Sequence, residues 1–140
     1  MKKSFLFFGF ALLLTLCLGL WTFRELNSHK NGVIKEFFPD GTLRSETTYK
    51  NGIPYGTSLV FFKNGKLKKS VEFIDGKQSG MTITYYETGQ VKSEEMYKAN
   101  KMEGHSRFYN EDGTLQWEAT YINDVKQMNT FRDYRKNRGN

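Results

Sequence analysis

The sequence predicts an all-β protein, an elongated antiparallel meander of about four 24-residue β-hairpins, preceded by one N-terminal hydrophobic helix. Three observations support this fold class. Glycine, aromatic and aliphatic residues recur every 24 positions between residues 32 and 121. Turn dipeptides such as Asn-Gly and Asp-Gly separate segments in which apolar and polar side chains alternate, which is typical of half-buried strands. An uncharged apolar run fills residues 5–23.

Residues 1–23 have the pattern of a membrane anchor or export signal. As a helix, the 19-residue run from Phe5 to Phe23 would extend roughly 28 Å, close to the thickness of a bilayer's hydrocarbon core. Lys2 and Lys3 precede the run and favour an N-terminus that stays in the cytoplasm. We therefore expect the rest of the chain outside the cytoplasm, held at the cell membrane by this single anchor.

Three interpretations of the run stay open. An uncleaved signal-anchor agrees with its length and with Trp21 near its outer end, where interfacial aromatic residues belong. A cleaved signal peptide would make the protein secreted or periplasmic, although no clear A-x-A site follows the run. A lipoprotein would be modified at Cys17, because residues 14–17 resemble a lipobox, with Leu16 where a small residue is expected.

Five columns of residues define the repeat after the linker at residues 24–31. Each column holds one residue type or a close substitute in four successive units, which chance does not explain. The columns are Gly32, Gly56, Gly80 and Gly104; Phe37, Phe61, Tyr85 and Tyr109; Gly41, Gly65, Gly89 and Gly113; Leu43, Leu67, Val91 and Leu115; and Tyr49, Phe73, Tyr97 and Tyr121.

Each unit is predicted to be one hairpin. In the second unit, a short first strand over Thr57–Phe62 leads to a turn at Asn64-Gly65, and the strand that follows alternates from Leu67 to Phe73. A second turn, Asp75-Gly76, begins a six-residue connection to the next repeat glycine. Both glycine columns are assigned to turns, where positive φ is needed. The repeat domain is predicted over residues 32–134, with a degenerate fifth unit as a cap and a basic tail at residues 135–140.

The recurring pattern G-x-x-x-x-[FY]-[FY]-x-x-G-x-[LV], followed by [YF]-x-[ND]-G, resembles MORN-type repeats, specifically the bacterial variant group. The resemblance covers roughly residues 28–134. It implies an exported 24-residue-repeat protein or an antitoxin-like, immunity-like protein. Some relatives carry a phosphatidylinositol-phosphate kinase name, but four hairpins are too short for a kinase domain.

Composition argues against several functions. The formal net charge of +6 arises at the two ends, because residues 24–124 contain 14 basic and 14 acidic side chains; a nucleic-acid partner is therefore not expected. One Cys and two His leave little material for a metal site. No Walker loop, nucleophile elbow or H-E-x-x-H motif occurs, so we expect neither an enzyme nor a cofactor.

The expected function is binding of a protein partner, in addition to membrane attachment through the N-terminal helix. Trp117, Arg107 and Tyr109 are the candidate contact residues, because they lie in the last full unit and Trp117 departs from the small or polar residues of its column. The aromatic columns are expected to form the core. The alternative function is a structural envelope protein that contacts lipid or cell wall through its basic ends.

Overall fold

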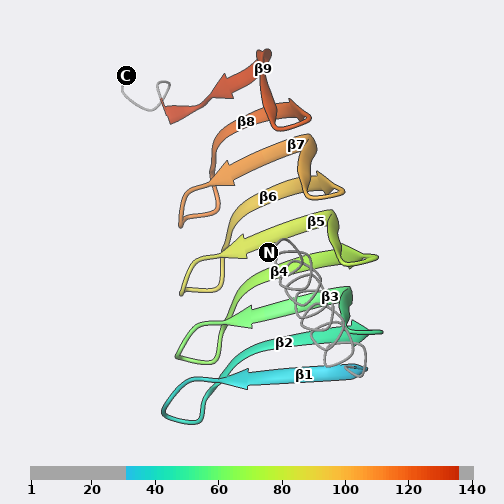
Figure 1. Ribbon diagram of the computed structural model, residues 1–140. Coiled ribbons are helices and arrows are strands. Elements are labelled where there is room, and N and C mark those ends of the chain that lie inside the picture. The colour runs from blue at the N-terminus through green and yellow to red at the C-terminus, as the bar shows by residue number, and fades with distance from the viewer. Residues whose placement is uncertain (1–30, 136–140) are drawn as a thin grey trace, which may run out of the picture.

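The computed structural model describes residues 31–135, which form one nine-stranded antiparallel sheet (Figure 1). The strands pair in chain order, which confirms the predicted meander. They are β1 (Gly32–Phe37), β2 (Leu43–Lys50), β3 (Ile53–Phe61), β4 (Leu67–Ile74), β5 (Lys77–Tyr85), β6 (Val91–Lys98), β7 (Lys101–Tyr109), β8 (Leu115–Ile122) and β9 (Val125–Asp133).

The predicted N-terminal helix, with Cys17 and the linker up to residue 30, lies outside the described residues, as does the tail beyond Arg135. Over residues 31–135, no helix is long and apolar enough to cross a membrane.

Two kinds of turn alternate along the sheet. Each kind joins the strand ends on one of its two sides (Figure 1). The turns that end β1, β3, β5 and β7 carry the glycines of the Gly41 column; Gly65, for example, has a φ of 80° and donates its N–H to the Phe62 carbonyl. The turns that end β2, β4, β6 and β8 contain two residues, both with positive φ, as type I′ hairpin turns require. Asn51-Gly52 forms the first of these turns and Asn123-Asp124 the last.

The predicted six-residue connections are wrong. After each two-residue turn the chain enters a strand at once, so β3 begins at Ile53 and β5 at Lys77. Gly56, Gly80 and Gly104 therefore lie inside strands rather than at turns, and Gly32 begins β1. Each has positive φ, and the register against β2, β4 and β6 shifts in the same stretch, which marks a β-bulge. A bulge, like a turn, requires a residue with positive φ, but the strand continues beyond it.

Four of the five sequence columns face one another across strand pairs. Gly32, Gly56, Gly80 and Gly104 lie opposite Tyr49, Phe73, Tyr97 and Tyr121; Phe37, Phe61, Tyr85 and Tyr109 lie opposite Leu43, Leu67, Val91 and Leu115. The 24-residue period thus records cross-strand pairing.

The aromatic columns do not form a buried core, contrary to expectation. The sheet is a single layer, and within residues 31–135 no second layer of secondary structure covers either face. The column aromatics are half-buried, apart from Phe37, which is 57% exposed. The buried residues are instead small: Ser58, Val71, Thr82, Ser93, Ser106 and Ala119. They share one face, called the serine face here, because they pair across neighbouring strands or lie two residues apart.

Candidate functional site

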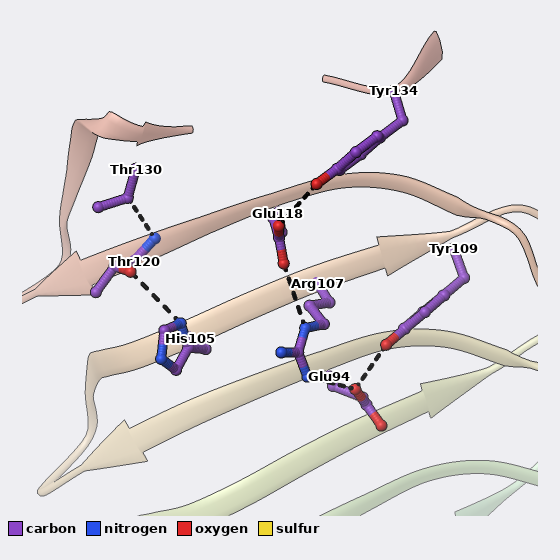
Figure 2. A network of polar contacts seen from close by, with 8 residues as sticks. All are labelled: Glu94, His105, Arg107, Tyr109, Glu118, Thr120, Thr130 and Tyr134. Atoms are coloured by element: carbon purple, nitrogen blue, oxygen red, sulfur yellow. Dashed lines mark hydrogen bonds and ion pairs between the residues drawn. The ribbon is translucent and has the colours of Figure 1, made fainter. Parts of the chain in front are cut away.

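The opposite face, called the charged face here, carries an alternating row of charges over β6, β7 and β8. Glu94 lies opposite Arg107, which lies opposite Glu118. The Arg107 guanidinium reaches both carboxylates, with Nη1 3.9 Å from Glu94 Oε2 and Nε 3.5 Å from Glu118 Oε2 (Figure 2). These side chains remain partly exposed, so each ion pair contributes only about 0.2–1 kcal/mol.

Two tyrosines attach to the same carboxylates. The Tyr109 hydroxyl donates to Glu94 Oε2 at 2.8 Å, and the Tyr134 hydroxyl donates to Glu118 Oε1 at 2.9 Å (Figure 2). Partial burial and then the bond to Glu94 raise the pKa of Tyr109 above its usual value, while Arg107 acts in the opposite direction. The bond to Glu118 is the main cause of the raised pKa of Tyr134. Both phenols therefore stay protonated as donors at neutral pH.

The last strand carries one extra residue, which changes its faces. Glu94 pairs with Arg107, so the 24-residue repeat would place Phe131 opposite Glu118; the observed partner is Arg132. The Thr130 side chain lies at this irregularity, where its hydroxyl oxygen accepts the Thr120 N–H at 2.8 Å. Because a shift of one residue exchanges the two faces of a strand, Phe131 moves to the serine face and Arg132 to the charged face.

An open hollow of about 320 Å³ lies on the charged face beside this irregularity. Its lining includes His105, Arg107, Asn129 and Arg132. His105 Nδ1 lies 3.5 Å from the Thr120 hydroxyl (Figure 2), and Arg132 Nη1 donates to the carbonyls of Asn129 and Phe131. In the described part of the chain, no group of three or more His, Cys, Asp or Glu side chains is arranged to hold a metal ion.

The structure brings two of the three candidate contact residues together. Arg107 and Tyr109 meet at Glu94 on the charged face. Trp117 lies on the serine face, because its direct partner is Phe108, the neighbour of Arg107 in β7. It is half-buried between Phe108 and Phe131. The three residues therefore do not form one patch, and their role in partner binding stays a prediction.

Sequence reasoning missed Glu94, Glu118 and Tyr134. A signal for the two glutamates was present in the repeat. Lys35 and Arg107 occupy the same repeat position, three units apart, and Glu46, Glu94 and Glu118 occupy the repeat position on the strand that pairs with it. Lys35 indeed pairs with Glu46 at 3.3 Å at the other end of the sheet. Tyr134 also had a signal, since it lies 24 residues after Asn110 in the column that begins with Phe38, Phe62 and Tyr86, although the fifth unit around it is degenerate.

The geometry defines a class of protein, a repeat protein whose unit is one β-hairpin and whose sheet grows by one hairpin per unit. The chain belongs to the MORN repeat variant family, which matches residues 30–51, 54–75, 78–99 and 102–123. This match confirms the resemblance drawn from the five columns.

Comparison with curated proteins finds no match. Among solved structures, the chain is similar to the crystal structure of TarM, with 20% identity over 81% of this chain and a TM-score of 0.45. A mutant of S. aureus TarM in complex with Fondaparinux, alpha-GlcNAc-glycerol and UDP gives 18% identity over 76% of this chain and a TM-score of 0.44. The matched region spans 23% of each of those chains, and the likeness concerns the fold alone.

Proposed function

We propose that this chain is a non-enzymatic repeat module, exported or anchored in the membrane, that binds a protein partner through the C-terminal part of its charged face. The observation that carries the proposal is the network of Glu94, Arg107, Glu118, Tyr109 and Tyr134. It presents an arginine and two tyrosines on an extended surface, and these residue types are enriched where protein interfaces gain most of their binding energy.

The repeat fold does not need this network. At the positions equivalent to Glu94 and Arg107, the units before it have Ser70 opposite Ile83, and Glu46 opposite Leu59. Those strands pair with the same register without a charge row. The additional charges at the C-terminal end therefore fit a role in recognition better than a role in folding.

The proposal is tested with a photo-crosslinking amino acid placed singly at Arg107 or Tyr109 in the full chain, in its native envelope. Lys35 is the matched control, because it is also ion-paired with a glutamate on the charged face but lies at the opposite end of the sheet. We expect a protein adduct from positions 107 and 109 and none from position 35. Equal adducts at both ends, or none at the C-terminal end, would contradict the proposal.

A narrower form of the proposal follows from the resemblance to antitoxin-like proteins, in which the partner is a toxin. A purified complex whose second chain inhibits growth when produced alone would support it. The alternative function, a structural envelope protein that contacts lipid or cell wall through its basic ends, predicts no protein adduct at position 107 or 109 and an envelope association that weakens steeply with salt.

The proposed location rests on the apolar run at residues 5–23 and on Lys2 and Lys3. Alkaline extraction of native membranes, followed by mass spectrometry of the N-terminus, separates the three interpretations. A retained chain that begins at Met1 indicates a signal-anchor, a released shorter chain indicates a cleaved signal peptide, and an acylated Cys17 indicates a lipoprotein. A soluble cytoplasmic chain would contradict export.

A further inference from the structure

A row of charges with alternating sign crosses the last four strands of the sheet. Glu94 in β6 lies opposite Arg107 in β7, which lies opposite Glu118 in β8. Glu118 in turn lies opposite Arg132 in β9. Directly opposed residues point to the same face, so the whole row lies on the charged face. Within residues 31–135 no strand pairs with the outer side of β9, and the row therefore ends there on a positive charge.

The inner members of the row compensate one another. The Arg107 guanidinium lies between two carboxylates, 3.9 Å from Glu94 Oε2 and 3.5 Å from Glu118 Oε2 (Figure 2). The other oxygen of Glu118, Oε1, accepts the Tyr134 hydroxyl at 2.9 Å. Both oxygens of Glu118 thus already have a donor, and Arg132 forms no ion pair with it or with any other residue among 31–135.

The Arg132 guanidinium rests on backbone carbonyls instead. Its Nη1 donates to the Phe131 carbonyl at 3.1 Å and to the Asn129 carbonyl at 3.2 Å. The Tyr134 N–H donates to the Gln116 carbonyl in β8, so alternation turns the backbone groups of Arg132 toward β8 and those of Phe131 outward. The guanidinium therefore lies over the open side of the last strand.

The contacts of Arg132 leave the better half of its guanidinium unused. Only Nη1 donates within the described part of the chain, so the Nε and Nη2 donors remain for a ligand. Arg135 shows what this pair of donors binds, because its Nε and Nη2 hold the two oxygens of Asp133 at 2.9 Å and 2.7 Å. Bonds from a guanidinium to a carboxylate are about twice as strong as bonds between neutral groups.

Arg132 lines the open hollow of about 320 Å³ on the charged face, and this hollow has an excess of basic groups. Its lining includes Arg107, Arg132 and His105 but a single acid, Glu118, which is already engaged. The His105 ring uses Nδ1 toward the Thr120 hydroxyl at 3.5 Å, which leaves Nε2 on the other side of the ring for a ligand.

A hollow of similar size at the N-terminal end of the sheet shows the contrast. It measures about 280 Å³ and its lining includes one base, Arg44, and one acid, Glu36. The Glu36 carboxylate accepts the Ser45 hydroxyl at 3.0 Å. The charges of that hollow balance, so the excess of basic groups at the C-terminal end does not follow from the repeat itself.

We propose that the hollow at Arg132 binds the carboxylate of an acidic side chain on the protein partner. This inference rests on the proposed function, since it names the chemistry that the charged face recognises on that partner. The partner's Asp or Glu continues the alternating row and takes the place that a carboxylate would have on a further strand. Arg132 holds both oxygens through Nε and Nη2, while His105 adds positive charge when its ring is protonated.

The first test uses a five-residue peptide with one central glutamate between glycine and serine residues and with both ends blocked. It is titrated into the full chain in a nonionic detergent, and NMR follows the Nε–H signals of the arginine side chains. We expect the Arg132 signal, assigned by its absence in Arg132→Lys, to shift with this peptide and not with the glutamine analogue. Equal shifts with both peptides, or none with the glutamate peptide, would overturn the proposal.

Arginine variants provide the matched control. Arg132→Gln should weaken binding of the glutamate peptide by about threefold to fivefold, the range of one partly exposed charge pair. Arg44→Gln removes an exposed arginine from the balanced hollow and should leave binding unchanged; thermal unfolding checks that both variants keep their fold. Equal weakening in both variants would overturn a specific site. Binding of a phosphoserine peptide without binding of the glutamate peptide would assign the hollow to phosphate instead.

The second test separates this inference from the proposed function. A photo-crosslinking amino acid at Tyr109 is combined with Arg132→Gln or with Arg44→Gln in the full chain in its native envelope. We expect the protein adduct to fall several-fold with Arg132→Gln and to persist with Arg44→Gln. An unchanged adduct in Arg132→Gln would overturn the carboxylate site and leave the proposed function standing. Absence of any adduct in the parent chain would contradict the proposed function itself.

Discussion

The ring of Trp117 stacks on the ring of Phe108, its direct partner across β7 and β8, with centroids 4.9 Å apart and planes 12° apart. The ring of Phe131 packs against Trp117 at 6.3 Å, and Lys126 Nζ lies 3.5 Å from the centre of the Phe131 ring. Phe131 contacts this cluster because the extra residue in β9 places its side chain on the serine face. The last strand therefore extends the aromatic cluster of the serine face by one ring.

We expect Trp117→Ala to lower the free energy of unfolding by about 2–3 kcal/mol, somewhat below the ~3–5 kcal/mol typical of fully buried aromatic residues, because Trp117 is half-buried. Urea denaturation measures this change. Phe37→Ala is the control: that ring is 57% exposed, so a loss below about 1 kcal/mol is expected. Unchanged stability of Trp117→Ala, combined with lost partner capture, would show instead that the indole is a binding anchor.

The fold was largely predictable because the 24-residue period follows directly from strand pairing. A glycine column and an aromatic column that face each other must recur together, and so must the turn glycines. The position of the Gly32 column was not predictable, because a positive φ suits a bulge as well as a turn, and spacing alone does not separate the two. The burial of Ser106 and Ala119 in place of aromatics reflects a single-layer sheet, where only small side chains lie low enough to be covered.

The candidate site was predicted in part for a related reason. Arg107 and Tyr109 are two residues apart in one strand, so alternation alone places them together. Whether Trp117 and Arg107 share a face depends on the cross-strand register. Trp117 pairs with Phe108, the neighbour of Arg107, so Arg107 lies on the opposite face. Arg132 depends on the irregularity in β9, for which no repeat position provides a template.

The β6–β7 turn carries a conformational penalty that one substitution should remove. Ala99 has a φ of 49°, whereas Asn51, Asp75 and Asn123 fill the equivalent position of the other type I′ turns. The left-handed region costs an ordinary L-residue about 1–2 kcal/mol, and asparagine tolerates it better. We expect Ala99→Asn to stabilise the protein by about 0.5–1 kcal/mol in thermal or urea unfolding. Lys98→Asn, one residue earlier and outside the positive-φ positions, should give no gain; an equal gain there would contradict this explanation.

Stability should also fall at high pH through Tyr97. Partial burial, the Glu95 carboxylate and the 3.2 Å bond that the Tyr97 hydroxyl donates to it raise the pKa of Tyr97 to about 12. The unfolded chain releases this proton near pH 10, so the folded state holds it more tightly. The contribution is therefore complete below about pH 10 and is lost as the pH rises toward 12.

Phenolate absorbance and urea unfolding between these pH values measure this effect of Tyr97. Tyr97→Phe should remove this phenol and flatten the decline in stability over this range. Glu95→Gln should move the titration of Tyr97 downward, because the nearby negative charge is gone. A decline of the same slope in Tyr97→Phe would show that other groups cause it.

Two serines on the serine face should respond oppositely to the same substitution. Ser93 and Ser106 are each only 1% exposed. The Ser93 hydroxyl shares a 2.6 Å hydrogen bond with Thr84, while Ser106 Oγ has no hydrogen-bond partner among residues 31–135.

Ser93→Ala therefore removes a hydrogen bond and should lower the free energy of unfolding by about 1 kcal/mol. Ser106→Ala removes a buried polar group without breaking any bond, so stability should stay the same or rise by about 1 kcal/mol. Because both changes delete one oxygen from an equally buried strand position, urea unfolding of the pair isolates the hydrogen bond; a similar loss in both variants would mean that Ser106 bonds an ordered water or that packing alone sets the cost.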